Sequence, residues 1–319
     1  MAYGGGGLLR RNWFFFLILL AIMIILFPWT VLRWVDQDIE IGEEFTIRVL
    51  LEDGTVETLG LEEYIIGVVA AEMPAEFAEE ALKAQAVAAR TYAAKRINEN
   101  INSNYDVDTT TNTQVWLSAK EMRDKWNWLS YWRYYGKISR AVESTRNQVL
   151  IANGQYVDAF FHSSTGRKPT ERSEDVWSSS RPYLQNIESG EENPNRFVKT
   201  TTLTPGELYK KLGIPDPPKA FSKNDFQILS ETATGRVKAI KVLGKSYTGS
   251  QLRTLLDLSS TDMEIDLTPQ EVKITTYGYG HGVGMSQYGA NDLANKGYNH
   301  EEILQHYYPG TSILTLKRS

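Results

Sequence analysis

A glutamate at the end of a predicted helix carries a carboxyl group that could act as a catalytic acid. The segment 61–74 has apolar side chains at the spacing of one buried helical stripe, namely Leu61, Tyr64, Ile65, Val68 and Val69. Glu72 continues this stripe, whereas Glu62 and Glu63 lie off it and are expected in solvent. A carboxyl group that loses hydration has a raised pKa, as a general acid near neutral pH requires. Because Pro74 ends the helix, Glu72 either projects into a cleft or turns outward to water.

Arg90 has a similarly apolar setting in the helix that follows. Its neighbours three and four residues away are Ala86, Val87, Ala93 and Ala94. An arginine in such a patch usually pairs with a carboxylate or a backbone carbonyl. Arg90 could brace the acid site or form a structural ion pair, and the pattern favours the structural role.

A polar run at the end of a predicted strand carries a second group of candidates. His162 and Ser163 open the run HSSTG (162–166), at a kind of position where functional side chains are common. Adjacent strand residues point to opposite faces, so His162 is poorly placed to deprotonate Ser163. The alternative is a loop histidine that is hydrogen-bonded to the backbone.

The run YGYGHGVGMSQYGA (277–290) contains five glycines, which permit tight turns or a close approach of the backbone to a ligand. It lacks the lysine of a P-loop and the strand, helix and acid of a dinucleotide site. His281 and Gln287 could line a polar cleft here, or the run could be a structural turn. The four histidines form no zinc-binding motif and there is no cysteine, so we predict no metal or other cofactor.

The charge of the 319-residue chain is unevenly distributed. Its formal net charge is −5; residues 1–35 contain three arginines and no acid, and the rest carries 31 basic against 39 acidic residues. So acidic a surface lacks the basic footprint of a nucleic-acid-binding protein. The absence of cysteine also excludes disulfides and thiol nucleophiles.

The N-terminal segment predicts a single membrane anchor. Residues 13–32 contain no charge and, at about 1.5 Å per residue, would span the roughly 30 Å of a hydrocarbon core. Arginines precede this run and acids follow it, which places residues 1–12 in the cytoplasm, a transmembrane helix at 13–34 and an ectodomain, 36–319, outside. The alternative is a cleaved signal peptide, but the run is long for one and no small-residue cleavage site follows it.

The ectodomain mixes helices and strands without a regular βαβ rhythm, which predicts an α+β fold with a substrate cleft and room for two lobes. Hairpins are predicted over 45–59 and 148–161, and strands over 226–243 and 263–276. Helices are predicted over 61–98 with a break at Pro74, and over 118–147, 250–257, 286–296 and 300–308. A polar loop is predicted over 100–114.

Four stretches, in this order, resemble the stage II sporulation protein D family of the SpoIID/LytB superfamily, which has amidase-enhancer relatives. They are EEYIIGVVAAEMPAEFAEEALKAQAVAARTYA (62–93), TNTQVW (111–116), YVDAFFHSSTG with SEDVW (156–177), and YGYGHGVGMSQYGA with HYYPGTS (277–312). The resemblance covers nearly the whole ectodomain, and the first and last stretches are highly specific.

This resemblance implies a lytic transglycosylase that cleaves between N-acetylmuramic acid and N-acetylglucosamine in peptidoglycan strands stripped of stem peptides. Glu72 matches the catalytic glutamate of the family's A-x-E-M-P motif. Arg90 and His162 match residues of the family's cleft, and Ser163, His281 and Gln287 are taken with them as substrate-binding residues. One acid suffices, because the muramyl C6 hydroxyl closes onto C1 and leaves a 1,6-anhydro end without water, unlike hydrolytic glycosidases.

Two features remain open within this resemblance. Some clostridial relatives bind zinc through cysteines, whereas this sequence has Lys168, Thr170 and Glu174 in that region, so zinc is not expected. A row of tryptophans could stack on sugar rings but is expected mainly in the core, namely Trp126, Trp128 and Trp132.

The resemblance further implies a cell-membrane protein that acts in engulfment, between mother cell and forespore. Its implied partners are a membrane-bound cell-wall amidase and a third engulfment membrane protein. The alternative is a non-catalytic glycan-binding protein that recruits or activates an amidase, although Glu72 and its motif are intact. A membrane-tethered adhesion domain would leave a glutamate on an apolar stripe unexplained.

Overall fold

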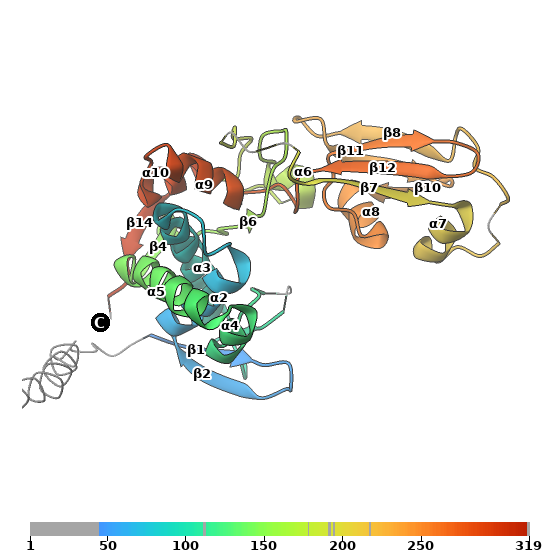
Figure 1. Ribbon diagram of the computed structural model, residues 1–319. Coiled ribbons are helices and arrows are strands. Elements are labelled where there is room, and N and C mark those ends of the chain that lie inside the picture. The colour runs from blue at the N-terminus through green and yellow to red at the C-terminus, as the bar shows by residue number, and fades with distance from the viewer. Residues whose placement is uncertain are drawn as a thin grey trace, which may run out of the picture. The chain divides into compact units, whose positions relative to one another are not determined.

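The computed structural model describes residues 45–110, 113–177, 179–190, 193, 195–216 and 218–317 (Figure 1). Their buried apolar side chains form two clusters. We call the parts of the chain around the first cluster the main lobe (45–190 and 283–317) and the part around the second the inserted lobe (198–277). No helix among these residues is long and apolar enough to cross a membrane, and the anchor predicted at 13–34 lies outside them.

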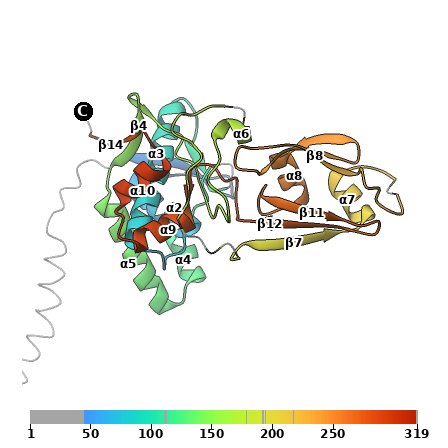
Figure 2. The ribbon, with the colours of Figure 1, turned by 90° about the horizontal axis from the view of Figure 1, so that it is seen from above.

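Helices form most of the main lobe. They are α2 (Leu61–Glu72), α3 (Glu79–Glu99), α4 (Ala119–Lys125), α5 (Trp128–Ser144), α6 (Ser173–Trp177), α9 (Gln287–Asn295) and α10 (His300–Tyr307). The predicted break at Pro74 is confirmed, because α2 ends at Glu72 and Met73 is extended. Small alanine side chains along α3 let α2, α5, α9 and α10 pack closely around it (Figures 1 and 2).

The helix predicted over 118–147 is two helices, α4 and α5. Asn127 lies between them in extended conformation, and its side chain accepts a hydrogen bond from the Ser130 N–H, which caps α5. Two tryptophans of α5 were expected in the core, but Trp128 is 73% and Trp132 61% exposed, so that prediction is wrong. Trp126 packs partly against the main cluster.

Three small sheets complete the main lobe. β1 (Thr46–Leu50) pairs with β2 (Val56–Gly60) in the predicted hairpin and with the short β3 (Val107–Asp108) of the loop over 100–114. β4 (Gln148–Ala152) lies between β14 (Ser312–Thr315) and β5 (Gln155–Tyr156). β6 (Phe161–His162) pairs in parallel with β13 (Met285–Ser286), which brings His162 beside the glycine-rich run.

A continuous outgoing strand was predicted over 156–161. This prediction is wrong for residues 157–160, which lie between β5 and β6 and form no strand. There the Phe160 carbonyl accepts hydrogen bonds from the Met285 N–H (3.0 Å) and the Tyr308 hydroxyl (2.7 Å). Asp158 pairs with Lys95 and Arg181. These partners come from distant segments, so the local alternation of side chains could not reveal them.

Two three-stranded sheets and two helices form the inserted lobe. One sheet contains β11 (Met263–Leu267), β12 (Val272–Tyr277) and β7 (Val198–Leu203), and the other β10 (Lys245–Thr248), β9 (Val237–Val242) and β8 (Phe226–Glu231). α7 (Pro205–Leu212) contacts β7, and α8 (Gly249–Leu256) contacts β9 and β10. The predicted strands and the helix near 250–257 are confirmed, as is the α+β class; β7, α7 and β10 were not predicted.

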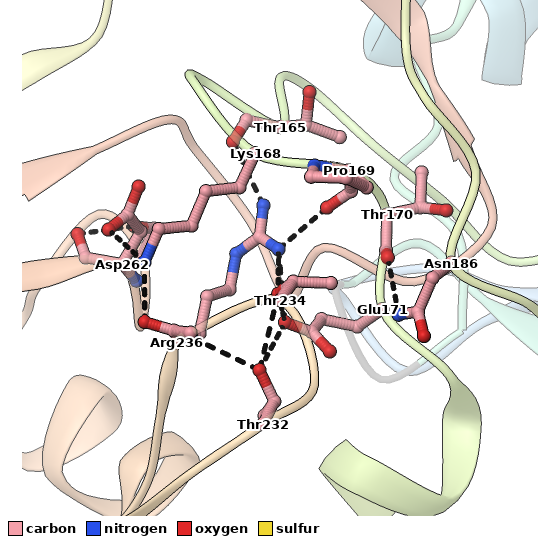
Figure 3. Close-up of polar contacts among 12 residues, drawn as sticks. Thr165, Lys168, Pro169, Thr170, Glu171, Asn186, Thr232, Thr234, Arg236 and Asp262 are labelled. Carbon is pink, nitrogen blue, oxygen red and sulfur yellow. Dashed lines mark hydrogen bonds and ion pairs between the residues drawn. The ribbon is translucent and has the colours of Figure 1, made fainter.

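A buried ionic network joins the two lobes (Figure 3). Arg236, just before β9, donates from Nη1 to Glu171 Oε1 (3.0 Å) and from Nη2 to the Thr165 carbonyl (3.0 Å). Both members of this ion pair are almost fully buried. The Glu171 N–H donates to the Gly282 carbonyl (2.7 Å), so the network also connects the loop after His162 to the glycine-rich run.

Candidate active site

A cavity of about 590 Å³, which we call the main cavity, lies where the end of α2, strand β6 and the glycine-rich run meet. Its volume is within the range of small-molecule sites. Five of the six candidate residues line it, namely Glu72, His162, Ser163, His281 and Gln287. These residues lie far apart in the chain, and the fold brings them to one cavity.

Glu72 is the last residue of α2 and lies half-buried in the cavity wall. Burial raises the pKa of its carboxyl group, and a hydrogen bond from the Val115 N–H to Oε1 (3.3 Å) opposes this effect only in part. The negative end of the α2 dipole disfavours the carboxylate as well. Among the described residues, no lysine or arginine forms an ion pair with Glu72. The carboxyl group therefore holds its proton to a higher pH than an exposed glutamate does.

Gly67 determines how closely the segment that carries Val115 approaches α2. A Cβ atom at Gly67 would lie 2.1 Å from Trp116 Nε1 and 2.6 Å from the Leu117 carbonyl oxygen. The Leu117 N–H donates to the Gly67 carbonyl (3.3 Å). Glycine is needed here for close packing, because any side chain at position 67 would displace the segment that carries Val115, whose N–H donates to Glu72.

The two cavity histidines are held as neutral rings in defined tautomers. His162 Nδ1 donates to the Val283 carbonyl (3.2 Å), so its Nε2 atom carries a lone pair. His281 Nδ1 instead accepts the Val283 N–H (3.1 Å), so its proton is on Nε2. Burial lowers the pKa of His162 well below its usual value and, with the charge of Arg253, lowers the pKa of His281 to about 4.

Aromatic rings and unpartnered polar atoms complete the wall. Trp177 lies next to Phe160 and His281, with ring centroids 4.8 and 5.0 Å apart. Within the described part of the chain, the buried His162 Nε2 and Gln114 Nε2 have no hydrogen-bond partner. The aromatic side chains of the wall suit a ligand with an apolar face, such as a sugar ring.

The residues around this cavity do not fit a zinc ion. In the described ranges, no three histidine, aspartate or glutamate side chains are placed to hold a metal. Lys168 pairs with Asp262 (3.0 Å), and the Thr170 hydroxyl donates to the Gln185 carbonyl (2.7 Å).

Another cavity, of about 370 Å³, contains Asp158, but this carboxylate already pairs with Lys95 and Arg181. We therefore place the candidate chemistry at Glu72.

Known proteins similar to this chain identify its family. The family described as SpoIID, Stage II sporulation protein, matches residues 52–151. Stage II sporulation protein D of Bacillus subtilis (strain 168) is 40% identical over 265 residues, which cover 81% of this chain and 76% of that protein. The protein of the same name from Bacillus amyloliquefaciens is 38% identical over 264 residues, covering 81% and 75%. This chain belongs to the stage II sporulation protein D family.

Membership of the stage II sporulation protein D family gives the chain a role in sporulation. The amidase enhancer of Bacillus subtilis (strain 168) is a more distant relative, 32% identical over 301 residues. That match covers 77% of this chain but 40% of the amidase enhancer.

Arg90 is the candidate residue that the structure places away from the cavity. Its side chain is 0% exposed, and its guanidinium donates to the Glu62 carboxylate, with Nε 2.9 Å from Oε1. The Val142 and Gln148 carbonyls accept its remaining bonds (3.2 Å each). Glu62 lies in the first turn of α2 and Glu72 ends this helix, so about 15 Å of helix separates this pair from the catalytic candidate.

This placement corrects two sequence-based expectations for the family motif. Glu62 was expected in solvent, but it is 2% exposed and paired with Arg90. Arg90 was expected to bind substrate because it matches a residue of the family's cleft, but each of its three guanidinium nitrogens donates a hydrogen bond inside the core. It holds α2 against α3, α5 and β4, which is the structural role that its apolar neighbours favoured.

Arg253 is a cavity residue that the sequence did not single out. It lies on α8 of the inserted lobe and lines the cavity together with Glu72 of the main lobe. In the sequence, its neighbours Leu252 and Leu256 indicate only a packed helix. No signal short of the fold itself would have predicted its place.

Proposed function

We propose that this protein is a lytic transglycosylase that cleaves the bond between N-acetylmuramic acid and N-acetylglucosamine in peptide-stripped peptidoglycan strands. The observation that carries the proposal is the setting of Glu72. It is the one carboxyl group among the described residues that line the main cavity, its pKa is raised, and it has no cationic partner. Hydrolytic glycosidases need a second carboxylate to act as nucleophile or to activate water.

In the proposed reaction, Glu72 serves first as acid and then as base. It transfers its proton to the glycosidic oxygen while the bond from that oxygen to C1 of the muramyl sugar breaks. The C6 hydroxyl oxygen of the same sugar then bonds to C1, and its proton returns to the Glu72 carboxylate. The product carries a 1,6-anhydro end, no water is consumed, and Glu72 ends as it began.

The remaining cavity residues would bind and orient the sugars. The indole of Trp177 and the ring of Phe160 offer apolar faces for stacking on a sugar ring. The Nε2 atoms of His162 and Gln114 have no partner but are enclosed by protein atoms, so they would reach a sugar hydroxyl or acetyl oxygen only after a local shift of the cavity wall. Since both histidines stay neutral, they would not compete with Glu72 as proton donors.

The test compares full-length protein in detergent as wild type, Glu72→Gln and Glu63→Gln. Glu63 lies on the same helix but is exposed, so it is a matched control. Stripped and peptide-bearing peptidoglycan are incubated with each protein, and released sugars are identified by mass spectrometry. We expect Glu72→Gln to lose about 10²–10⁴-fold in rate and Glu63→Gln to lose little. Equal loss in both variants, or none in Glu72→Gln, would refute the assignment.

We further propose that residues 13–34 anchor the protein in the cell membrane, with 1–12 in the cytoplasm and 36–319 outside. The uncharged run and its flanking charges support this orientation. In this position the protein would act on the cell wall during engulfment, together with a membrane-bound amidase and a third engulfment membrane protein. Protease protection of either end in intact cells would test the orientation.

The second candidate function is a glycan-binding protein that activates an amidase. Its support is the similarity to a relative named amidase enhancer. It predicts that Glu72→Gln still binds glycan and still raises the rate of a purified cell-wall amidase, while neither wild type nor variant releases glycan fragments. Fragment release by the wild type alone would instead favour the transglycosylase.

A further inference from the structure

The main cavity has a cationic side chain to which the proposed reaction gives no task. Arg253 lies in the last turn of α8 and lines the cavity that contains Glu72. Its Nε donates to the Ser259 carbonyl (3.2 Å), which also accepts the Gly280 N–H (3.0 Å). The shared acceptor ties Arg253 to the glycine-rich run beside His281.

Further contacts fix α8, and with it Arg253, on the inserted lobe. Gly249 begins α8 so close to β9 that a Cβ atom would lie 1.9 Å from the Val237 carbonyl oxygen. Val237 follows Arg236, whose buried ion pair with Glu171 joins this strand to the main lobe (Figure 3). The position of Arg253 therefore depends on packed elements and not on an unsupported loop.

The terminal nitrogens of Arg253 are available for a ligand. In the described ranges they have no hydrogen-bond partner, and no carboxylate forms an ion pair with the guanidinium. Burial lowers the pKa of Arg253, and electrostatic interactions with Tyr279 and Asp257 oppose this effect only in part. An arginine stays charged at neutral pH, and a partly buried charge without a counter-ion is unfavourable. A bound anion would offset that cost.

The shape of the group indicates which anion. A guanidinium presents two parallel N–H donors that match the two oxygens of a carboxylate. Among the described lining residues of this cavity Arg253 is the one lysine or arginine, and both histidines are neutral near pH 7. A carboxylate on a glycan in this cavity would thus find its counter-charge at Arg253.

We propose that Arg253 forms a carboxylate-binding subsite for the lactyl group of N-acetylmuramic acid. The proposal rests on the glycan substrate given above. In a stripped strand the lactyl group ends in a free carboxylate, whereas in a peptide-bearing strand the same carbon belongs to an uncharged amide. Arg253 would therefore distinguish the two strands by charge, in addition to any exclusion of the stem peptide by size.

The test uses two glycan tetrasaccharides that differ only at the lactyl group, one with free carboxylates and one with methylamides. Binding to full-length protein in detergent is measured by calorimetry in the Glu72→Gln background, so that no cleavage occurs. We expect Glu72→Gln to prefer the carboxylate glycan about 10- to 100-fold. Adding Arg253→Gln should remove the preference and leave the affinity for the methylamide unchanged. Adding Arg253→Lys should retain part of the preference for the carboxylate glycan. The control is Arg140→Gln, which changes an exposed arginine on α5 and should retain the whole preference.

Three results would overturn the subsite. They are equal binding of the two glycans by the Glu72→Gln protein, a preference that survives Arg253→Gln, and an equal loss of affinity for both glycans in that variant. Cleavage by wild-type protein is measured separately. A carboxylate preference that depends on Arg253, without any release of anhydro fragments by the wild type, would refute the transglycosylase and support the subsite.

Discussion

Replacement of Arg90 by methionine separates a structural role from a role in the cleft. Met keeps an apolar side chain of similar length but leaves the Glu62 carboxylate, 2% exposed, without its cation. Removing one partner of a buried ion pair typically costs about 3–5 kcal/mol. At roughly 2.1 cal/mol/K of unfolding entropy per residue, the compact unit from Phe45 to Ser319 would lose about 5–9 °C in Tm.

The assay is thermal unfolding of the full-length chain in detergent, followed by circular dichroism, with glycan cleavage measured well below Tm. The double variant Glu62→Gln/Arg90→Met removes the unpaired charge and should recover most of the lost Tm and the cleavage rate. Arg146→Met is the control, because Arg146 makes a similar two-bond pair with Glu143 on the surface, and it should lower Tm by less than about 2 °C. An unchanged Tm for Arg90→Met, or a double variant that recovers Tm but not cleavage, would refute the structural role.

Two further predictions concern the surroundings of Glu72. Gly67→Ala would force Trp116 and the segment with Val115 away from α2. We therefore expect the free energy of unfolding to fall by about 1–3 kcal/mol and glycan cleavage to be slower. Wild-type values in both assays would contradict this prediction. Because the pKa of Glu72 is raised in the folded state, the folded protein binds this proton more tightly than the unfolded chain, and stability falls as pH rises through the raised pKa. Glu72→Gln should therefore have a higher Tm than wild type at pH 7 and the same Tm below about pH 4, where the carboxyl group is protonated in both states. A Tm difference that does not change with pH would show that the pKa is not raised.

Periodicity could predict the acid because the reason for its raised pKa is local. The apolar stripe of α2 and the proline that ends the helix are both within 61–74, and together they place Glu72 at the end of a buried face. His281 and Gln287 could also be predicted locally, because the glycines around them indicate a close approach of the backbone to a ligand or a tight turn. Neither pattern shows that the two segments meet, which depends on the packing of α2 and α9 against α3.

The residues that the sequence did not place depend on partners from distant segments. Glu62 lies off the apolar stripe and was expected in solvent, but Arg90 from α3 meets it inside the core. Arg253 lies in a helix whose pattern predicts packing alone, and it reaches the cavity because the inserted lobe is joined to the main lobe. α7 is different, because Thr204 and Glu207 form a capping box around Pro205, the first residue of the helix. This local signal would have predicted α7.

In the proposed reaction, Glu72 cleaves the glycan without the help of water. The most direct test is to treat stripped glycan with full-length wild-type and Glu72→Gln protein in water enriched in oxygen-18, and to weigh the new muramyl ends by mass spectrometry. We expect muramyl ends that are lighter by one water than a reducing sugar and contain no oxygen-18, and we expect them from the wild type alone. Reducing ends that contain oxygen-18 would mean hydrolysis, and anhydro ends from Glu72→Gln at the wild-type rate would mean that another group is the acid.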